Sequence, residues 1–264
     1  MTLSWLSAGG YFLRAGVRHS RGEVVFEGVY LLLMSAILMT WINVWAMMPD
    51  SVLASFDLSF VQIVWYVCCT EIVAFSVPKL HREIELMIYE GRFASLLLRP
   101  FPWLIEWLAG HIGQGLVFLL FFAGASSLVA LAATGAWLLS PSVLPFLLLH
   151  LVFAQAIWMV WMTIIGLSVP WLGSASTLYM IVQKFAFIFG GLLLPIALYP
   201  GWLAALAYVT PFPAIFGVVG EVVLDPSWAH FVRAAAYQFL VLGASLLVLL
   251  WLWRRFVTHL LQEG

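Results

Sequence analysis

The chain has 264 residues, of which 64% are hydrophobic and 9% are charged, and its formal net charge at pH 7 is −1. Soluble domains are about 45–50% apolar and about 25% charged, so this composition excludes a soluble globular protein and indicates an integral membrane protein. The few basic residues form no patch large enough to bind a nucleic acid, and we exclude that class too.

Six apolar segments are long enough to cross a membrane as helices. A hydrocarbon core about 30 Å thick needs roughly 20 apolar residues per helix. The segments are residues 24–47, 59–77, 110–139, 143–169, 178–198 and 232–253. Each is continuously apolar, whereas barrel strands would be about 10 residues long with alternating polarity. We therefore expect an all-α integral membrane protein with six membrane-spanning helices in a single domain, residues 1–264.

Basic residues flank the same ends of the expected spans. With six spans, three basic segments fall on one side, and their cations are Arg14, Arg18, Arg21, Lys79, Arg82, Arg92, Arg99, Arg254 and Arg255. The positive-inside rule places such segments in the cytoplasm. We therefore expect a multi-pass protein with both termini in the cytoplasm.

Residues 1–22 mix apolar and basic side chains. Trp5, Leu6 and Phe12 share this stretch with Arg14 and Arg18. The mixture is typical of an amphipathic helix in the membrane interface, with its cations toward anionic headgroups. We expect such an interfacial helix here; the alternative is a plain basic segment before the first span.

Two ionisable residues fall inside the expected spans. Glu71 lies in the second and Lys184 in the fifth, at comparable depths from the same side. A charge within the bilayer is costly and normally faces the bundle interior, where it finds a partner. We expect a Glu71–Lys184 ion pair; the alternative is that each is satisfied by backbone, water or the membrane edge.

The segment 78–102, between the second and third spans, is the most densely charged part of the chain. Ile84, Met87 and Ile88 fall at i, i+3 and i+4, which predicts a short amphipathic helix, and Gly91 is a natural end for it. Such a helix suits a groove in a soluble partner. The alternative is a solvated loop whose charges only set the topology.

Two later segments have unusual composition. The third span is rich in glycine (Gly110, Gly113, Gly115 and Gly124), so it is either broken or closely packed against a neighbour. Residues 199–231 are apolar but interrupted by prolines. Irregular backbone is tolerated within a membrane only where protein covers it. We therefore expect 199–231 to form a re-entrant segment on the outer side.

Two groups of residues resemble a known family. The first is Arg82-Glu83-Ile84, then Glu90-Gly91-Arg92, then Leu96-Leu97-Leu98-Arg99-Pro100; the second is Phe189-Gly190-Gly191, Leu194-Pro195, Tyr199-Pro200 and Thr210-Pro211-Phe212. In this order, in a six-span chain, they resemble the permease subunits of bacterial ABC transporters of the type-2 exporter class.

This resemblance implies a transport subunit that is not itself an enzyme and has no catalytic, cofactor or metal residues. Its coupling helix would dock on a separate ABC ATPase, present in two copies, which binds ATP and Mg. The coupling residues would be Arg82, Glu83, Glu85, Glu90, Gly91 and Arg99. A second permease chain, identical or homologous, would complete the exporter in the bacterial inner membrane. Neither Lys79 nor Lys184 lies in a P-loop motif, which agrees with ATP binding by another chain.

The apolar, aromatic interior favours a hydrophobic or amphipathic substrate, such as a drug-like compound or a lipid. The main alternative function is an ion-coupled secondary transporter that uses Glu71 and Lys184 as its relay. A membrane-embedded enzyme is disfavoured because the sequence contains neither His-Glu-x-x-His nor Gly-x-Ser-x-Gly.

Overall fold

The structure is a computed structural model that describes residues 2–99 and 102–263. Within these ranges the side chains of residues 2–9, 19–27, 50, 94 and 263 are not described. Pro100 and the side chains of Trp5, Leu6 and Arg21, which entered the sequence analysis, therefore lie outside the described residues.

Helices make up 82% of the structure, and no strand occurs among the described residues. The elements are α1 (Thr2–Ala46), α2 (Asp50–Ala54), α3 (Phe60–Ser76), α4 (Leu80–Tyr89), α5 (Phe93–Leu97), α6 (Trp103–Thr134), α7 (Leu144–Leu167), α8 (Val169–Leu172), α9 (Ala175–Phe189), η1 (Ile196–Leu198), α10 (Gly201–Val209), α11 (Phe212–Ile215), α12 (Gly217–Leu224) and α13 (Trp228–Glu263). The all-α prediction is confirmed.

Five helical stretches in the described part of the chain are long and apolar enough to cross a membrane: Gly28–Ala46, Phe60–Tyr89, Trp103–Thr134, Leu144–Leu167 and Trp228–Gln262. Burial separates inner from outer helices: in an 18-residue apolar part of each stretch, 72% of the residues of Phe60–Tyr89 and 67% of those of α7 are buried, against 22–28% in the other three. A helix that is apolar all round but exposed needs an apolar surrounding. The chain is therefore a membrane-embedded helical bundle built around α3 and α7.

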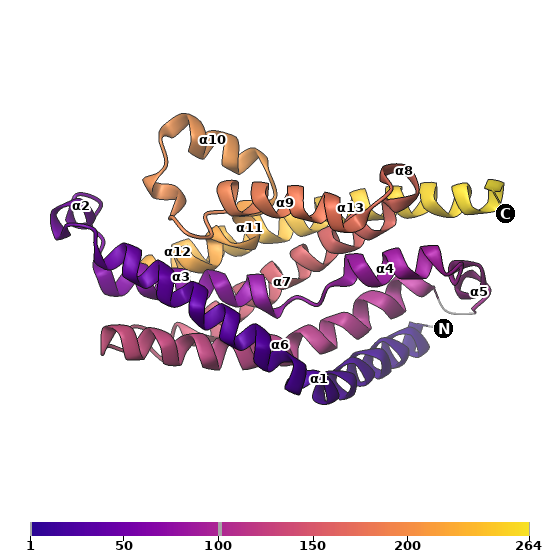
Figure 1. The fold of residues 1–264 in the computed structure, drawn as a ribbon, viewed down its shortest axis with the longest axis horizontal. Helices are drawn as coiled ribbons and strands as arrows, with labels where there is room; N and C mark the ends of the chain where they lie inside the picture. The colour runs from indigo at the N-terminus through magenta and orange to yellow at the C-terminus, as the bar shows by residue number, and fades with distance from the viewer. Residues whose placement is uncertain (1, 100–101, 264) are drawn as a thin grey trace.

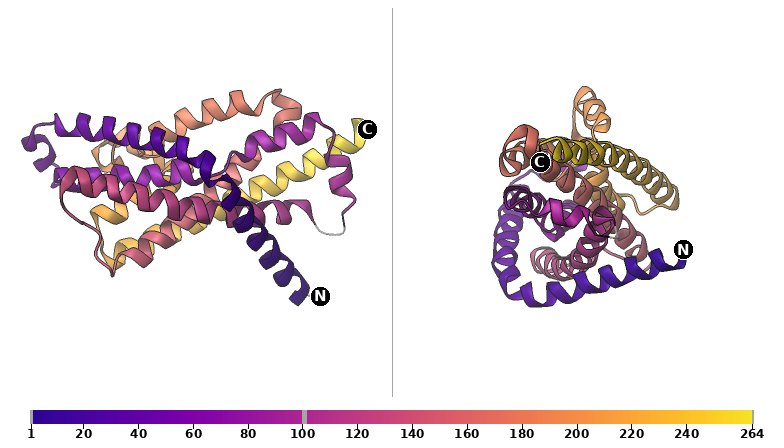
Figure 2. Two further views of the ribbon diagram at one scale, coloured as in Figure 1. Left: turned by 60° about the horizontal axis from the view of Figure 1, so that its bottom comes forward. Right: turned by 90° about the vertical axis from the view of Figure 1, so that its right-hand side faces the viewer.

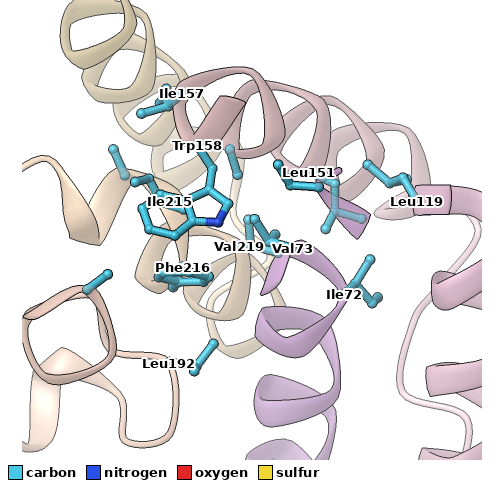
Figure 3. Close-up of a cluster of buried hydrophobic side chains, with 14 of the residues drawn as sticks. Ile72, Val73, Leu119, Leu151, Ile157, Trp158, Leu192, Ile215, Phe216 and Val219 are labelled. Carbon is cyan, nitrogen blue, oxygen red and sulfur yellow. The ribbon is translucent and has the colours of Figure 1, made fainter. Parts of the chain in front are cut away.

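The bundle has two distinct ends (Figure 1). We call one the α4 end; it carries α4, α5, α8 and both chain termini, while α2 lies at the opposite end. Between the ends, Trp158 of α7 packs edge-on against Phe216, with ring centroids 5.8 Å apart. Val73 and Val219 lie beside this pair, and Ile72 extends from α3 on the side of Leu119, so the core joins α3, α7, α11 and α12 (Figure 3).

The first part of α1 is bent away from the part that follows it and crosses the bundle (Figure 2). The crossing on α6 is close: a Cβ added to Gly16 would lie 1.8 Å from the Gly110 carbonyl oxygen, and one added to Gly113 would lie 2.1 Å from that of Leu13. Helix α6 is continuous over 32 residues. Gly113 therefore serves close packing, a Cβ added to Gly124 would meet nothing within 4 Å, and none of the glycines breaks the helix.

The predicted straight span over 178–198 is not formed. Helix α9 ends at Phe189 after 15 residues, which at 1.5 Å per residue is about 22 Å and shorter than a hydrocarbon core. Gly191 adopts φ +72°, a left-handed conformation that ends a helix, and Pro195 follows before the short η1 turn. The span was predicted from apolar composition, which does not take account of these helix-ending residues.

The segment after α9 folds back onto α3. Tyr66 Oη donates a short hydrogen bond to the Gly191 carbonyl, and Thr70 Oγ1 donates to that of Leu192 over 2.7 Å. A Cβ added to Gly220 would lie 2.3 Å from the Tyr66 ring, so α12 packs closely on the same face. The irregular backbone of this segment is thus covered by protein along α3.

Candidate functional site

Helix α4 is anchored by its apolar face. Leu80 and Ile84, one helical turn apart, are fully buried, while Met87 and Ile88 are half-buried. A Cβ added to Gly166 would lie 2.7 Å from Ile84 Cβ, so the absence of a side chain there lets α4 lie directly on α7. The spacing in the sequence predicted this amphipathic helix, and its existence is confirmed.

Two of the predicted coupling carboxylates bond within the chain. Glu83 Oε2 lies 3.2 Å from His111 Nε2 of α6. Glu85 Oε1 accepts a hydrogen bond from the Ala175 backbone N–H over 3.0 Å, and its Oε2 accepts one from Ser176 Oγ over 3.4 Å. A carboxylate at a helix N-terminus meets free N–H groups and the positive end of the dipole. Glu83 thus links α4 to α6, and Glu85 caps α9.

The remaining predicted coupling residues lie in the first turn of α4 (Arg82) and in the connection from α4 to α6 (Glu90, Gly91 and Arg99). Gly91 adopts φ +66°, and Glu90 forms an exposed ion pair with Arg92 at 2.6 Å. Arg82 and Arg99 are exposed, and Arg99 Nη1 lies 3.2 Å from Glu106 Oε1. Sequence reasoning grouped these residues with Glu83 and Glu85. The structure separates them, because Glu83 and Glu85 bond to helices distant in the chain, whereas Glu90 and Arg99 pair with near neighbours in sequence.

Helix α5 is held by an aromatic cluster. Phe93 is only 2% exposed and packs edge-on against Trp103 of α6 and Phe256 of α13, with ring centroids 4.9 Å apart in each case. Trp103 also stacks on Trp253 at 5.2 Å. Edge-on and offset rings are favourable arrangements. The cluster fixes the segment that connects α4 to α6 against the C-terminal helix.

Exposed apolar side chains lie beside α4. Leu86 and Tyr89 are one turn apart on α4, and Tyr89 Oη donates a hydrogen bond to the Gly173 carbonyl over 2.6 Å. That bond brings them next to α8, where Trp171 and Leu172 are also exposed. We call these four residues the α4–α8 surface. Helices α4 and α8 therefore expose four large apolar side chains near one another at this end.

A cavity of about 750 Å³ opens into the bundle near α4. Its walls come from α1, α3, α6, α7 and α9, together with the 77–79 connection and Glu83 of α4. Drug-sized ligand pockets are typically about 300–1,000 Å³. The cavity thus has the volume of a small-molecule site and adjoins the base of α4.

Glu71 and Lys184 both line this cavity. In the described part of the chain no ion pair joins them; the Lys184 Nζ lies 5.8 Å from the Phe187 ring centroid. The expected Glu71–Lys184 pair is therefore absent, although the two residues share one site. Lys184 is exposed because α9 lies at the edge of the bundle, whereas Glu71 sits on the central helix α3 and is 3% exposed.

Sequence reasoning missed several polar residues of the cavity. Lys79 Nζ donates a short hydrogen bond to the Tyr30 hydroxyl, and Gln183 Nε2 donates to Tyr179 Oη over 2.9 Å. Tyr179 also stacks on His81 of α4, with ring centroids 4.2 Å apart. The available signal was the spacing of Tyr179 and Gln183 at i and i+4 on an otherwise apolar helix, which places both on one face.

No protein-family model matches this chain, and the curated proteins include no significant relative. The site is therefore interpreted from its own geometry. At the α4 end a short helix is hydrogen-bonded to α6 and α9 and packs on α7, and it adjoins a small-molecule-sized cavity.

Proposed function

We propose that the chain is the permease subunit of an ATP-driven exporter of the ABC type-2 class. The observation that carries this proposal is the placement of α4. The helix lies at one end of a membrane bundle, bonds to α6 and α9 through Glu83 and Glu85, and rests on α7 through Ile84. A partner that moves α4 would displace three helices at once.

The α4 end is the cytoplasmic side in this proposal. It carries both termini and the exposed cations Arg82 and Arg99 (Figure 1), which suits the positive-inside rule. Helix α9 starts at this end and α13 returns to it, so α9 together with residues 190–198 would act as a sixth crossing. Residues 199–231 would then cover the outer end of the pathway.

In the proposed mechanism two copies of a separate ATPase bind ATP and Mg, and each contacts the α4–α8 surface of one permease. Leu86 and Tyr89 would enter the ATPase groove, with Arg82, Glu90 and Gly91 at the polar rim; exposed aromatic and apolar residues are typical interface anchors. Closure of the ATPase dimer would favour one of two arrangements of the bundle. The substrate would be hydrophobic or amphipathic, because apolar side chains dominate the cavity wall.

The test is to purify the chain gently from its native membrane and identify the proteins that accompany it, with their stoichiometry. We expect two P-loop ATPase subunits with two permease chains, identical or homologous. A chain that emerges alone, and onto which no ATPase can be reconstituted, would contradict the proposal.

A pair of matched variants sharpens this test. Leu86 is 54% exposed on the α4–α8 surface, and Trp202 is 70% exposed on α10, away from the α4 end. We expect Leu86→Glu to weaken ATPase association by about 10-fold or more, because it places a charge in an apolar interface. Trp202→Glu should leave association unchanged, and equal losses in both variants would contradict docking at α4.

The alternative function is an ion-coupled secondary transporter. The observation in its favour is that Glu71 and Lys184 line the same cavity without pairing with each other. An intramembrane carboxylate of this kind is a common proton relay. Transport that collapses with an uncoupler and survives ATP depletion would favour this alternative over the ABC exporter.

A further inference from the structure

We propose that the cavity beside α4 binds an amphipathic organic ammonium compound, and that Glu71 is the counter-ion of its amine. This assignment names the substrate class of the proposed exporter. It rests on the proposed function only for the transport step, because binding itself requires neither ATP nor a partner.

The first argument is that the Glu71 carboxylate is buried without a partner among the described residues. Its polar neighbours on α3 are satisfied, since Thr70 Oγ1 donates to the Leu192 carbonyl and Ser76 Oγ accepts from Gln155 Nε2 over 3.2 Å. Glu71 is 3% exposed and lines the cavity, yet no hydrogen bond or ion pair from any described residue reaches its side chain. A buried carboxylate without a partner is costly, so an ammonium group entering the cavity would satisfy it.

The second argument is the depth of the site. Glu71 and Met162 are each 3% exposed and form the inner wall, whereas Leu33 is 50% exposed and Lys79 and Lys184 are exposed, which places these three at the mouth. A ligand that reaches Glu71 must therefore extend through the cavity. Its body would lie against aromatic and aliphatic side chains of the wall, so the body must be apolar.

The third argument is that the other charged groups of the wall face other partners. Lys79 donates to the Tyr30 hydroxyl, Lys184 lies over the Phe187 ring, and Glu83 faces His111. Glu71 thus pairs with no cation among the residues described. A metal ion is a poor candidate, because no cluster of three or more His, Cys, Asp or Glu side chains occurs in the described ranges.

Aromatic rings of the cavity wall also favour an ammonium ligand. Trp41 of α1 and Phe75 of α3 both line the cavity. The faces of aromatic rings attract ammonium groups, most strongly where water is excluded, and the same rings pack against an apolar body. One molecule that carries an amine on an apolar skeleton would therefore use both kinds of contact.

The test uses three probes of nearly equal size and shape: 2-(1-naphthyl)ethylamine, 2-(1-naphthyl)ethanol and 1-naphthylacetate. Each is titrated by calorimetry into the purified full-length chain in detergent, with empty micelles as the blank. We expect the wild-type chain to bind the amine about 30-fold more tightly than the alcohol, because only the amine supplies a cation to a buried carboxylate. Equal affinities, or a preference for the carboxylate probe at the two lysines, would overturn the proposal.

Two variants test whether the preference for the amine depends on Glu71. Glu71→Gln keeps the shape of the side chain and removes its charge, so it should weaken amine binding about 30-fold and leave alcohol binding within about twofold. Glu106→Gln removes a carboxylate of α6 that lies outside the cavity wall and pairs with Arg99, and it should leave the amine preference intact. A loss of both probes in Glu71→Gln, or loss of the amine preference in Glu106→Gln, would contradict the assignment.

The outcome is independent of the proposed function. No ATPase takes part in the titration, so a failure to prefer the amine would contradict the cavity assignment alone. A chain that prefers the amine but emerges from its membrane without an ATPase would contradict the exporter proposal alone.

Discussion

The carboxylates of the α4 region and the carboxylate deep in the neighbouring cavity differ in whether they bond to other helices. On α4, Glu83 and Glu85 are used to hold helices together, through His111 of α6 and the first residues of α9. In the cavity Glu71 is more deeply buried, yet no described residue bonds to it. The difference teaches that two carboxylates of the densely charged segment hold helices together, whereas the carboxylate inside the bundle contributes no such bond among the described residues.

Among the substitutions that test this comparison, we expect the largest change in the free energy of unfolding from one on the buried face of α4. Ile84→Ala should reduce the free energy of unfolding by about 3 kcal/mol, because the side chain is fully buried and its removal leaves a cavity against Gly166 of α7. The measurement is unfolding of the purified chain in increasing SDS.

The matched control lies on the other face of the same helix. Leu86 is 54% exposed, so Leu86→Ala should change the free energy of unfolding by less than about 0.5 kcal/mol. Equal destabilisation by Ile84→Ala and Leu86→Ala would show that α4 is not anchored through Ile84.

The next effect concerns Glu85. Glu85→Ala should reduce the free energy of unfolding by about 2 kcal/mol, because two donors at the start of α9 lose a charged acceptor. Hydrogen exchange at the first turn of α9 should increase along with it. Unchanged exchange there, with unchanged stability, would indicate that Glu85 does not cap α9.

Much of the α4 region could be predicted from sequence, because its signals are local. The i, i+3, i+4 spacing of Ile84, Met87 and Ile88 predicted the helix and its buried face, and Gly91 predicted its end. The bonds of its carboxylates could not be predicted, since His111 lies 28 residues from Glu83, and Ala175 lies 90 residues from Glu85. Only the packing of helices distant in the chain brings these partners together.

The cavity was predicted only in part. The cost of burying charge indicated that Glu71 and Lys184 face the bundle interior, and both do line one cavity. The expected ion pair failed because α9 ends at Phe189 and lies at the edge of the bundle, which leaves Lys184 exposed. The apolar composition of 178–198 predicted a membrane-spanning helix. It did not predict that the chain leaves the helical path at Gly191 and Pro195.

A smaller effect, opposite in sign to that of Glu85, is expected at Glu71. Glu71→Gln should increase the free energy of unfolding by about 1 kcal/mol in the absence of ligand, because a neutral amide is less costly to bury than a carboxylate without a partner. Unfolding in SDS measures it beside Glu85→Ala. Destabilisation by Glu71→Gln would mean that the carboxylate supports the fold, and the contrast between the two regions would disappear.

The smallest effect is expected at the tip of the α4 region. Glu90 pairs with Arg92 at 2.6 Å, but both side chains are more than half exposed. Water and salt screen such a pair, so Glu90→Ala should change the free energy of unfolding by about 0.5 kcal/mol or less. The decisive measurement is the same SDS unfolding at low and at high salt, beside Glu85→Ala. A salt-independent loss as large as that of Glu85→Ala would show that the tip also holds the fold together, and that the exposed carboxylate is not reserved for a partner.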